Sequence, residues 1–376
     1  PPTQLPLLDS PAPWRELARH ERGARYVRIE PRRVLNGPES TGMGFWSINP
    51  YIGCEFGCTY CYARDTHRWA VERAGGRMDA WADGRMAEET VEVDKPAEAI
   101  IRPSDHPSTR LPAWLAFEKV ILVKEEAAAV LAGSFAPAQV MGDTIIIGTA
   151  TDPYQPAEKM FGVTRRILER FLGYRGLKLG IITKSPLVVR DIDLLVRLSA
   201  LHELKVNISL ASLDRQMVRR LEARSPAPQA RLRALKALTD AGVEAGLMVA
   251  PIVPGLTDGR AALRALLVAG KEAGARYAYG SALRLGPAAR NRFLPHLARK
   301  FPALQERYAR RYGRSDKAGK DYEDALSARF RALQEELGYT TQISFTRNKR
   351  GTTEGHGESR RNAVVVGDQI GSVDQD

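Results

Sequence analysis

Three cysteines, Cys54, Cys58 and Cys61, stand within one short stretch of the chain, which contains no other cysteine. Their spacing is C-x3-C-x2-C, and the aromatic residue Tyr60 directly precedes the last of them. Thiolates are the soft ligands that iron–sulfur clusters select. Three of them can hold three irons of a [4Fe–4S] cube and leave the fourth iron open to a small chelating molecule. The spacing therefore predicts a cluster-binding loop with one open iron.

Zinc binding and disulfide formation are two other uses that three cysteines can have. A structural zinc site takes four ligands at tetrahedral spacing, and His67 is the only histidine close by in the sequence. A disulfide would leave one thiol unpaired, and three cysteines in a chain of 376 residues do not make a secreted scaffold. Zinc or another type of cluster remains the alternative.

The composition indicates a globular protein of the cytosol. Hydrophobic residues make up 44% of the chain, enough for a substantial core. No apolar run approaches the ~18 residues that a membrane span needs. The stretch 1–6 has no basic head followed by an apolar block, so it does not resemble a signal peptide. We expect a cytoplasmic protein with no membrane contact.

The net charge of +12 is a second constraint, because a basic surface attracts polyanions. DNA or RNA is one partner that this charge predicts. An acidic electron carrier, such as a flavodoxin or a ferredoxin, is another, because a basic face would steer that encounter. An Arg-rich composition alone is a third explanation of the charge.

Short apolar strands alternate with amphipathic helices from Phe45 onward, which predicts an α/β fold with a parallel sheet and right-handed crossovers. Chemistry in such sheets gathers at the carboxyl ends of the strands. The expected strands are 45–49, 144–149, 179–183, 205–211, 245–250 and 277–283, with a further short strand at 120–123. The expected helices are 64–73, 125–131, 157–173, 191–201, 229–241, 259–273, 291–312 and 320–337.

Interruptions of this alternation of strands and helices predict the domain organisation. Residues 1–44 form an N-terminal extension, and 45–285 form the α/β domain with an insertion at about 74–118. Residues 286–348 form a basic helical region, and the polar, Gly-rich tail 349–376 is expected to be disordered.

The cysteine spacing with its aromatic residue resembles the radical SAM superfamily. Further stretches resemble its spore photoproduct lyase-like branch, and above all the uncharacterised bacterial members of that branch. The resemblance runs from about Ser47 to Leu283. The stretches that carry it are 62–67, 149–158, 182–185, 221–226 and 248–258.

This resemblance implies a partial (β/α)6 barrel of the TIM type, a [4Fe–4S] cluster on the three cysteines and S-adenosylmethionine (SAM) on the open iron. One electron from the cluster then splits SAM and releases a 5′-deoxyadenosyl radical. In the resembling lyases a lysine at the place of Lys184 binds the carboxylate of SAM. The full set of residues assigned to cofactor binding is Tyr60, Thr149, Thr151, Lys184, Asn207, Ser209 and Arg224.

Several of these assignments have a structural alternative. The hydroxyls of Thr149 and Thr151 suit the amino acid end of SAM, but an Asp-Pro turn that caps a strand explains them as well. Asn207 and Ser209 share one strand face by the period of two and suit the ribose. Lys184 also fits a surface position, and Arg224 also fits a role in pinning the turn at Ser225.

Two residues after a strand tip, Tyr154 and Glu158, are assigned to the substrate side as catalytic residues. The alternative for Glu158 is the preference of a helix N-terminus for an acidic residue. The chain departs from spore photoproduct lyase at one point. Those enzymes place a cysteine hydrogen donor where this chain has Thr149, and a threonine O–H is a poor hydrogen-atom donor. Repair of the spore thymine dimer by the thiol route is therefore not expected.

Three functions follow from these patterns. The first is a radical SAM enzyme acting on nucleic acid, as a lesion or as a target of modification. The second is a radical SAM enzyme acting on a small molecule or a peptide, with the basic face serving the electron donor. The third is a non-catalytic iron–sulfur or zinc protein that binds nucleic acid.

Overall fold

The computed structural model describes residues 14–20, 23–41, 44–65, 113–140, 142–313 and 315–340. The expected helix 64–73 and the insertion at 74–118 lie mostly outside these residues, and the tail 349–376 lies wholly outside them. No helix within the described ranges combines the length and the hydropathy that a membrane span requires.

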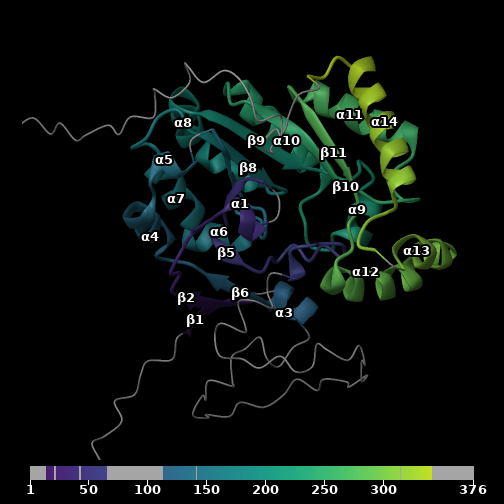
Figure 1. Cartoon of the computed structure of the whole chain (residues 1–376), viewed down its shortest axis with the longest axis horizontal. Helices are drawn as coiled ribbons and strands as arrows, with labels where there is room; N and C mark the ends of the chain where they lie inside the picture. The colour runs from purple at the N-terminus through teal and green to yellow at the C-terminus, as the bar shows by residue number, and fades with distance from the viewer. Residues whose placement is uncertain are drawn as a thin grey trace, which may run out of the picture.

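A seven-stranded sheet forms the body of the protein, in the order β11-β10-β9-β8-β7-β4-β3. Figure 1 labels its strands β8 to β11. Six of these strands run parallel, and β3 (Leu35–Asn36) pairs antiparallel with β4. The predicted partial barrel of six parallel strands is therefore confirmed. The parallel strands are β4 (Trp46–Ile48), β7 (Thr144–Ile147), β8 (Lys178–Thr183), β9 (Glu203–Ser209), β10 (Ala245–Ile252) and β11 (Ala278–Ala282).

Helices connect these strands, as the alternating pattern predicts. The expected helix 157–173 is divided in two because Gly162 adopts a left-handed φ of 60°. A short helix, α9, was not expected from the sequence. The connecting helices are α6 (Pro156–Phe161), α7 (Val163–Phe171), α8 (Ile192–Leu201), α9 (Arg215–Leu221), α10 (Pro228–Asp240) and α11 (Arg260–Glu272), with a 3-10 helix at Pro186–Asp191.

A second, four-stranded sheet was not predicted. It has the order β1-β2-β6-β5 and draws β1 (Trp14–Arg19) and β2 (Arg25–Ile29) from the N-terminal extension. The short predicted strand 120–123 is β6 (Val120–Val123), and it pairs antiparallel with β5 (Tyr51–Ile52). This sheet therefore holds the start of the segment that carries the cysteines. The remaining short helices of this part of the chain are α1 (Pro38–Thr41), α3 (Ala113–Lys119), α4 (Ala127–Ser134) and α5 (Pro137–Val140). Of these, α3 packs against β6, α1 packs against β4 and α4 packs against α7.

Basic helices follow the last strand. The expected helix 291–312 is two helices, α12 (Pro287–Lys300) and α13 (Gln305–Tyr312), because a 3-10 turn begins at Pro302 between them. The other expected helix is α14 (Lys320–Glu336), which packs against β11 and α11 (Figure 1). Phe293, Tyr308 and Tyr312 share one apolar cluster with Cys54 and Cys58. The cysteine segment and the C-terminal helices therefore form one packed unit.

Candidate cofactor site

The three cysteines lie on a loop, residues 53–61, that follows β5; we call it the cysteine loop. Gly53 has a φ of 90°, and a Cβ there would lie 2.9 Å from the carbonyl oxygens of Phe117 and Val120. Gly57 has a φ of 60°, and a Cβ there would lie 2.3 Å from the guanidinium of Arg224. Both positions therefore require glycine, because the backbone is left-handed and its surroundings leave no room.

All three thiols are shielded from solvent, Cys61 less than the other two. Burial raises the pKa of each thiol, and the charges of Cys58 and Cys61 raise that of Cys54 further. Iron would therefore bind in exchange for protons. No three His, Cys, Asp or Glu side chains in the described ranges converge as ligands of a single metal ion. The ligands of a cluster bind different irons, so the thiols of the cysteine loop fit a cluster without such convergence.

The cysteine loop is joined to the segment that follows α9. Cys58 and Glu222 form an antiparallel bridge, and the amide of Thr59 donates to the carbonyl of Leu221 at 2.9 Å. The amide of Arg224 donates in turn to the carbonyl of Phe56 at 3.2 Å. These contacts bring the carboxylate of Glu222 beside the thiols.

Lys184 occupies the centre of the site. It follows β8, and its ammonium donates to Ser209 Oγ at 2.9 Å and to Glu222 Oε1 at 3.1 Å. The same ammonium lies 3.5 Å from the hydroxyl of Tyr60, which donates to Glu222. Its positive charge lowers the pKa of Cys58 and of Cys61, against the larger effect of burial. The structure thus brings Tyr60, Lys184 and Ser209 together, three of the residues assigned to the cofactor.

Glu222 is the residue that the sequence analysis missed. Burial alone would raise its pKa, but Arg231 and Lys184 hold that pKa well below its usual value. Arg231 is fully buried, pairs with Glu222 and donates to the carbonyl of Ser209 at 2.8 Å. Glu222 belongs to the stretch 221–226 that carries the family resemblance. Within that stretch the sequence analysis assigned only Arg224 to the cofactor.

Asn207 also faces the interior of the barrel. Its amide donates to the carbonyl of Ile181 at 3.1 Å. Its Oδ1 is buried and accepts no hydrogen bond from the described part of the chain. A buried acceptor without a partner is costly, so a polar ligand in the barrel would fit this atom.

The threonines assigned to the cofactor hydrogen bond to the chain itself. The hydroxyl of Thr151 donates to the carbonyl of Gly53 at 2.6 Å and accepts from Gln155 at 2.9 Å. Thr149 Oγ1 accepts from the side-chain amide of Asn49 at 3.1 Å. Asp152 accepts from Thr183 Oγ1 at 2.6 Å and from the amide of Lys184 at 2.7 Å. These contacts match the alternative of a capped strand end, and they fix the cysteine loop and Lys184 in place.

Arg224 pins the cysteine loop from outside. Its guanidinium donates to the carbonyl of Glu55 at 2.5 Å and to Glu118 at 2.6 Å. Glu118 is buried and also pairs with Arg64 at 2.5 Å and with Arg292 of α12 at 3.2 Å. The binding of Arg224 to the carboxylate of SAM stays a prediction.

Tyr154 and Glu158 are both fully buried. The carboxylate of Glu158 accepts from Tyr51 at 2.5 Å, from the amide of Thr164 at 2.8 Å and from Arg190 at 2.8 Å. Burial raises the pKa of Tyr154, and the charges of Asp191 and Glu158 add to this. Neither side chain presents a group to solvent, so their assignment as catalytic residues stays a prediction without a contact to support it.

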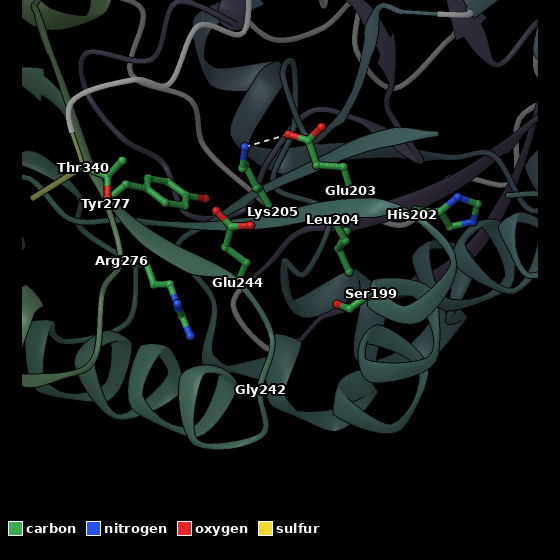
Figure 2. Close-up of a pocket in the computed structure, with 10 residues that line it drawn as sticks. All are labelled: Ser199, His202, Glu203, Leu204, Lys205, Gly242, Glu244, Arg276, Tyr277 and Thr340. Carbon is green, nitrogen blue, oxygen red and sulfur yellow. Dashed lines mark hydrogen bonds and ion pairs between the residues drawn. The ribbon is translucent and has the colours of Figure 1, made fainter. Parts of the chain in front are cut away.

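A cavity of about 570 Å³ lies at the other end of the sheet (Figure 2). Glu203, Glu244 and Tyr277 line it, at the amino ends of β9, β10 and β11. An ion pair of 2.8 Å joins Glu203 to Lys205 in its wall. The cysteines and Lys184 lie at the carboxyl ends of the strands, where parallel sheets carry their chemistry, so this cavity is not the cofactor site.

Comparison with known proteins decides the family. The family model described as "Radical SAM superfamily" matches residues 48–267. The chain belongs to the radical SAM superfamily. Members of this superfamily use SAM and an iron–sulfur cluster and need an electron donor, so this much of the sequence-based prediction is confirmed.

Two relatives of this radical SAM protein are described as uncharacterized proteins. One from Mycobacterium tuberculosis is 30% identical over 313 residues, which cover 83% of this chain and 80% of the relative. One from Methanocaldococcus jannaschii is 26% identical over 232 residues, 62% of this chain and 69% of the relative. The structure is similar to that of a spore photoproduct lyase complexed with dinucleoside spore photoproduct. That likeness has a TM-score of 0.54 at 16% identity and covers 83% of this chain and 79% of the other. It confirms the predicted fold, which the chain shares with the lyase.

Proposed function

We propose that this protein cleaves SAM reductively, with a [4Fe–4S] cluster on Cys54, Cys58 and Cys61, and acts on a nucleic acid. The observation that carries the proposal is the position of Lys184. Its side chain is 14% exposed, and its ammonium is held between Ser209 and Glu222, beside the buried thiols. A fixed cation at this place suits the carboxylate of SAM.

Several side chains around Lys184 would help to bind the cofactor. Three thiolates carry three negative charges, which Lys184 and Arg231 partly offset inside the protein. Ser209 and the free acceptor of Asn207 suit the hydroxyls of a ribose. The bound cofactor would supply a 5′-deoxyadenosyl radical, and these residues would orient SAM and keep water away from it.

Binding of SAM tests this arrangement. We expect Lys184→Met to bind iron and sulfide as the wild type does but to weaken SAM binding by about tenfold or more, because a charge-assisted hydrogen bond is lost. Lys205→Met, at the far end of the sheet, is the matched control. Equal SAM affinity of the two variants, measured by calorimetry under anaerobic conditions, would remove Lys184 from the site.

Two observations support a nucleic acid as the substrate. The chain carries a net charge of +12, and a lyase of the same fold has been solved with a dinucleoside photoproduct. The chain has no cysteine outside the cysteine loop, so a thiol is not the hydrogen donor. We therefore expect a reaction on nucleic acid that differs from the thiol-dependent repair of the spore lesion.

Fluorescence anisotropy with labelled DNA and RNA tests the substrate class. Binding should weaken steeply between 50 and 200 mM salt, because each phosphate contact releases counterions. Absence of binding at 50 mM salt would contradict a nucleic acid substrate. SAM cleavage in the same preparation would then favour a small molecule or a peptide.

Part of the positive charge lies on the basic helices α12 and α13, where it would suit the docking of an acidic electron donor. Aromatic residues of α12 and α13 pack against the cysteine loop, and Arg299, Lys300, Arg307 and Arg310 lie exposed on the same two helices. An acidic flavodoxin or ferredoxin docked there would lie close to the thiols. Cross-linking of flavodoxin to α12 or α13 would support this donor site, and cross-links elsewhere would contradict it.

A further inference from the structure

Two exposed tyrosines distinguish one edge of the barrel. Within the described ranges, the large apolar side chains that remain exposed are Tyr62, Met160, Val196 and Tyr279. Met160 and Val196 lie on α6 and α8, in the layer of helices. Tyr62 directly follows the last cysteine, and Tyr279 lies on β11, the edge strand of the sheet. The two tyrosines are 46% and 37% exposed.

The ring of Tyr62 is held in its exposed position. Its hydroxyl donates to the carbonyl of Thr149 at 2.5 Å, just past the carboxyl end of β7. Its own carbonyl accepts from the amide of Asp65 at 3.4 Å. The ring is therefore tied at its hydroxyl and at its backbone, and ordering it on a ligand would cost little conformational entropy.

Tyr279 points into the barrel. A Cβ on the next residue, Gly280, would lie 2.7 Å from the ring of Phe330 on α14, so Gly280 faces the helices. Alternation along β11 puts Tyr279 on the opposite face, together with Tyr277. Tyr277 covers Gly246, where a Cβ would lie 2.2 Å from its ring. Tyr279 is thus the next aromatic ring above Tyr277 toward the carboxyl end.

The segments that carry the two tyrosines meet beside Cys61. Asp65 accepts a hydrogen bond of 3.0 Å from the amide of Ala288, which ties the end of the cysteine segment to the start of α12. Ala63 shares one apolar cluster with Leu283 and Leu285, the residues on either side of Arg284. Tyr62 and Arg284 therefore lie on neighbouring segments, and Arg284 follows Tyr279 and β11 by a few residues. Arg284 pairs with Asp316 at 2.9 Å in an exposed ion pair, and such a pair contributes little and is readily exchanged for another anion.

We propose that Tyr62 and Tyr279 stack an unpaired nucleobase at the open edge of the barrel, with Arg284 beside them for its phosphate. The inference rests on the nucleic acid substrate proposed above. Exposed aromatic rings next to a basic group bind single-stranded nucleic acid in this way, because every base offers a π-face. A base bound there would lie next to Cys61, where the radical would be generated.

The experiment uses the full chain reconstituted anaerobically and a single-stranded oligonucleotide that carries one 5-iodouracil. Irradiation joins this base to an aromatic ring on which it stacks, and mass spectrometry identifies the residue. We expect the cross-link on Tyr62 or Tyr279. Tyr62→Ala and Tyr279→Ala should each weaken binding roughly 5- to 100-fold, since a stacked base loses about that much on alanine substitution. Tyr62→Phe, Tyr279→Phe and the control Met160→Ala should bind within about twofold of the wild type.

Three results would overturn the stacking site. In the first, salt-dependent binding persists at wild-type strength in both alanine variants, and the nucleic acid proposal itself survives. In the second, the cross-links fall only outside residues 62 and 279, for example on α12. In the third, no oligonucleotide binds at low salt, and the nucleic acid substrate falls together with the site. The position of the cross-link in the wild-type chain keeps the test decisive if an alanine variant fails to retain iron.

Discussion

At the scale of the residue, one lysine and one glutamate organise the site. Lys184 and Ser209 were predicted because each follows or ends a parallel strand, and the carboxyl ends of such strands meet at one edge. Glu222 was not predicted, since it lies on a turn whose partners come from three distant segments. Tertiary contacts of this kind leave no periodic signal in the sequence.

Loss of the Glu222 carboxylate should destabilise the protein. We expect Glu222→Gln to lower the free energy of unfolding by about 3–5 kcal/mol, because Arg231 and Lys184 would be left as buried cations without their counter-charge. Thermal or urea denaturation of the metal-free chain measures this change. Glu203→Gln, which removes one partner of a half-exposed pair, should change stability by less than about 1 kcal/mol. Equal stability of the two variants would contradict the ion network.

At the scale of the element, the cysteine loop is supported by two sheets, of which the sequence predicted only one. The parallel strands follow from apolar runs separated by turns, and all six are present. The second sheet was missed because β1 pairs with β2, and β2 joins the sheet through a long-range parallel pairing with β6, which local sequence patterns do not reveal. The cysteine loop was therefore predictable from its cysteines, and the elements that support it were not.

Gly57 tests the packing of the cysteine loop. In Gly57→Ala the new methyl group would meet Arg224 and Glu118 in a left-handed backbone. We expect the variant to retain less than about a tenth of the wild-type iron, since Arg224 could no longer fix the loop. Gly142→Ala is the matched control, because Gly142 has a φ of 84° and nothing within 4 Å. Similar iron content in the two variants would contradict a role of the Arg224 contact in holding the loop.

Lys124 connects the two sheets, and its lowered pKa predicts that the stability of the protein depends on pH. It follows β6, donates to the carbonyl of Asn49 at 2.9 Å, and burial lowers its pKa from 10.5 to about 8. Between these two values the unfolded chain holds a proton that the folded chain has lost. This proton makes stability rise with pH across the window, by about 1.4 kcal/mol per pH unit.

The comparison with Lys124→Met isolates this contribution from other titrating groups. The free energy of unfolding of the wild type, relative to that of the variant, should increase between pH 8.5 and 10 by about 1–2 kcal/mol. Urea denaturation at several pH values gives the two curves. Parallel curves over this range would mean that Lys124 keeps its ordinary pKa in the folded protein.

At the scale of the whole molecule, an open barrel carries the cysteines at the carboxyl ends of its strands and basic helices packed against them. The family and the fold were predictable, because a three-cysteine motif and an alternating pattern are local features of the sequence. The substrate was not, because it depends on which side chains the tertiary fold leaves exposed. Tyr62 and Tyr279 lie more than two hundred residues apart in the chain.

The most direct test of the central claim is the release of 5′-deoxyadenosine. The protein is reconstituted anaerobically with iron and sulfide, reduced with dithionite and incubated with SAM, and the product is followed by chromatography. We expect 5′-deoxyadenosine from the wild type and none from Cys58→Ala, because one iron of the cluster would lose its ligand. A well-formed cluster that never cleaves SAM, with or without plain or irradiated DNA, would contradict the enzymatic function and favour a non-catalytic iron–sulfur protein.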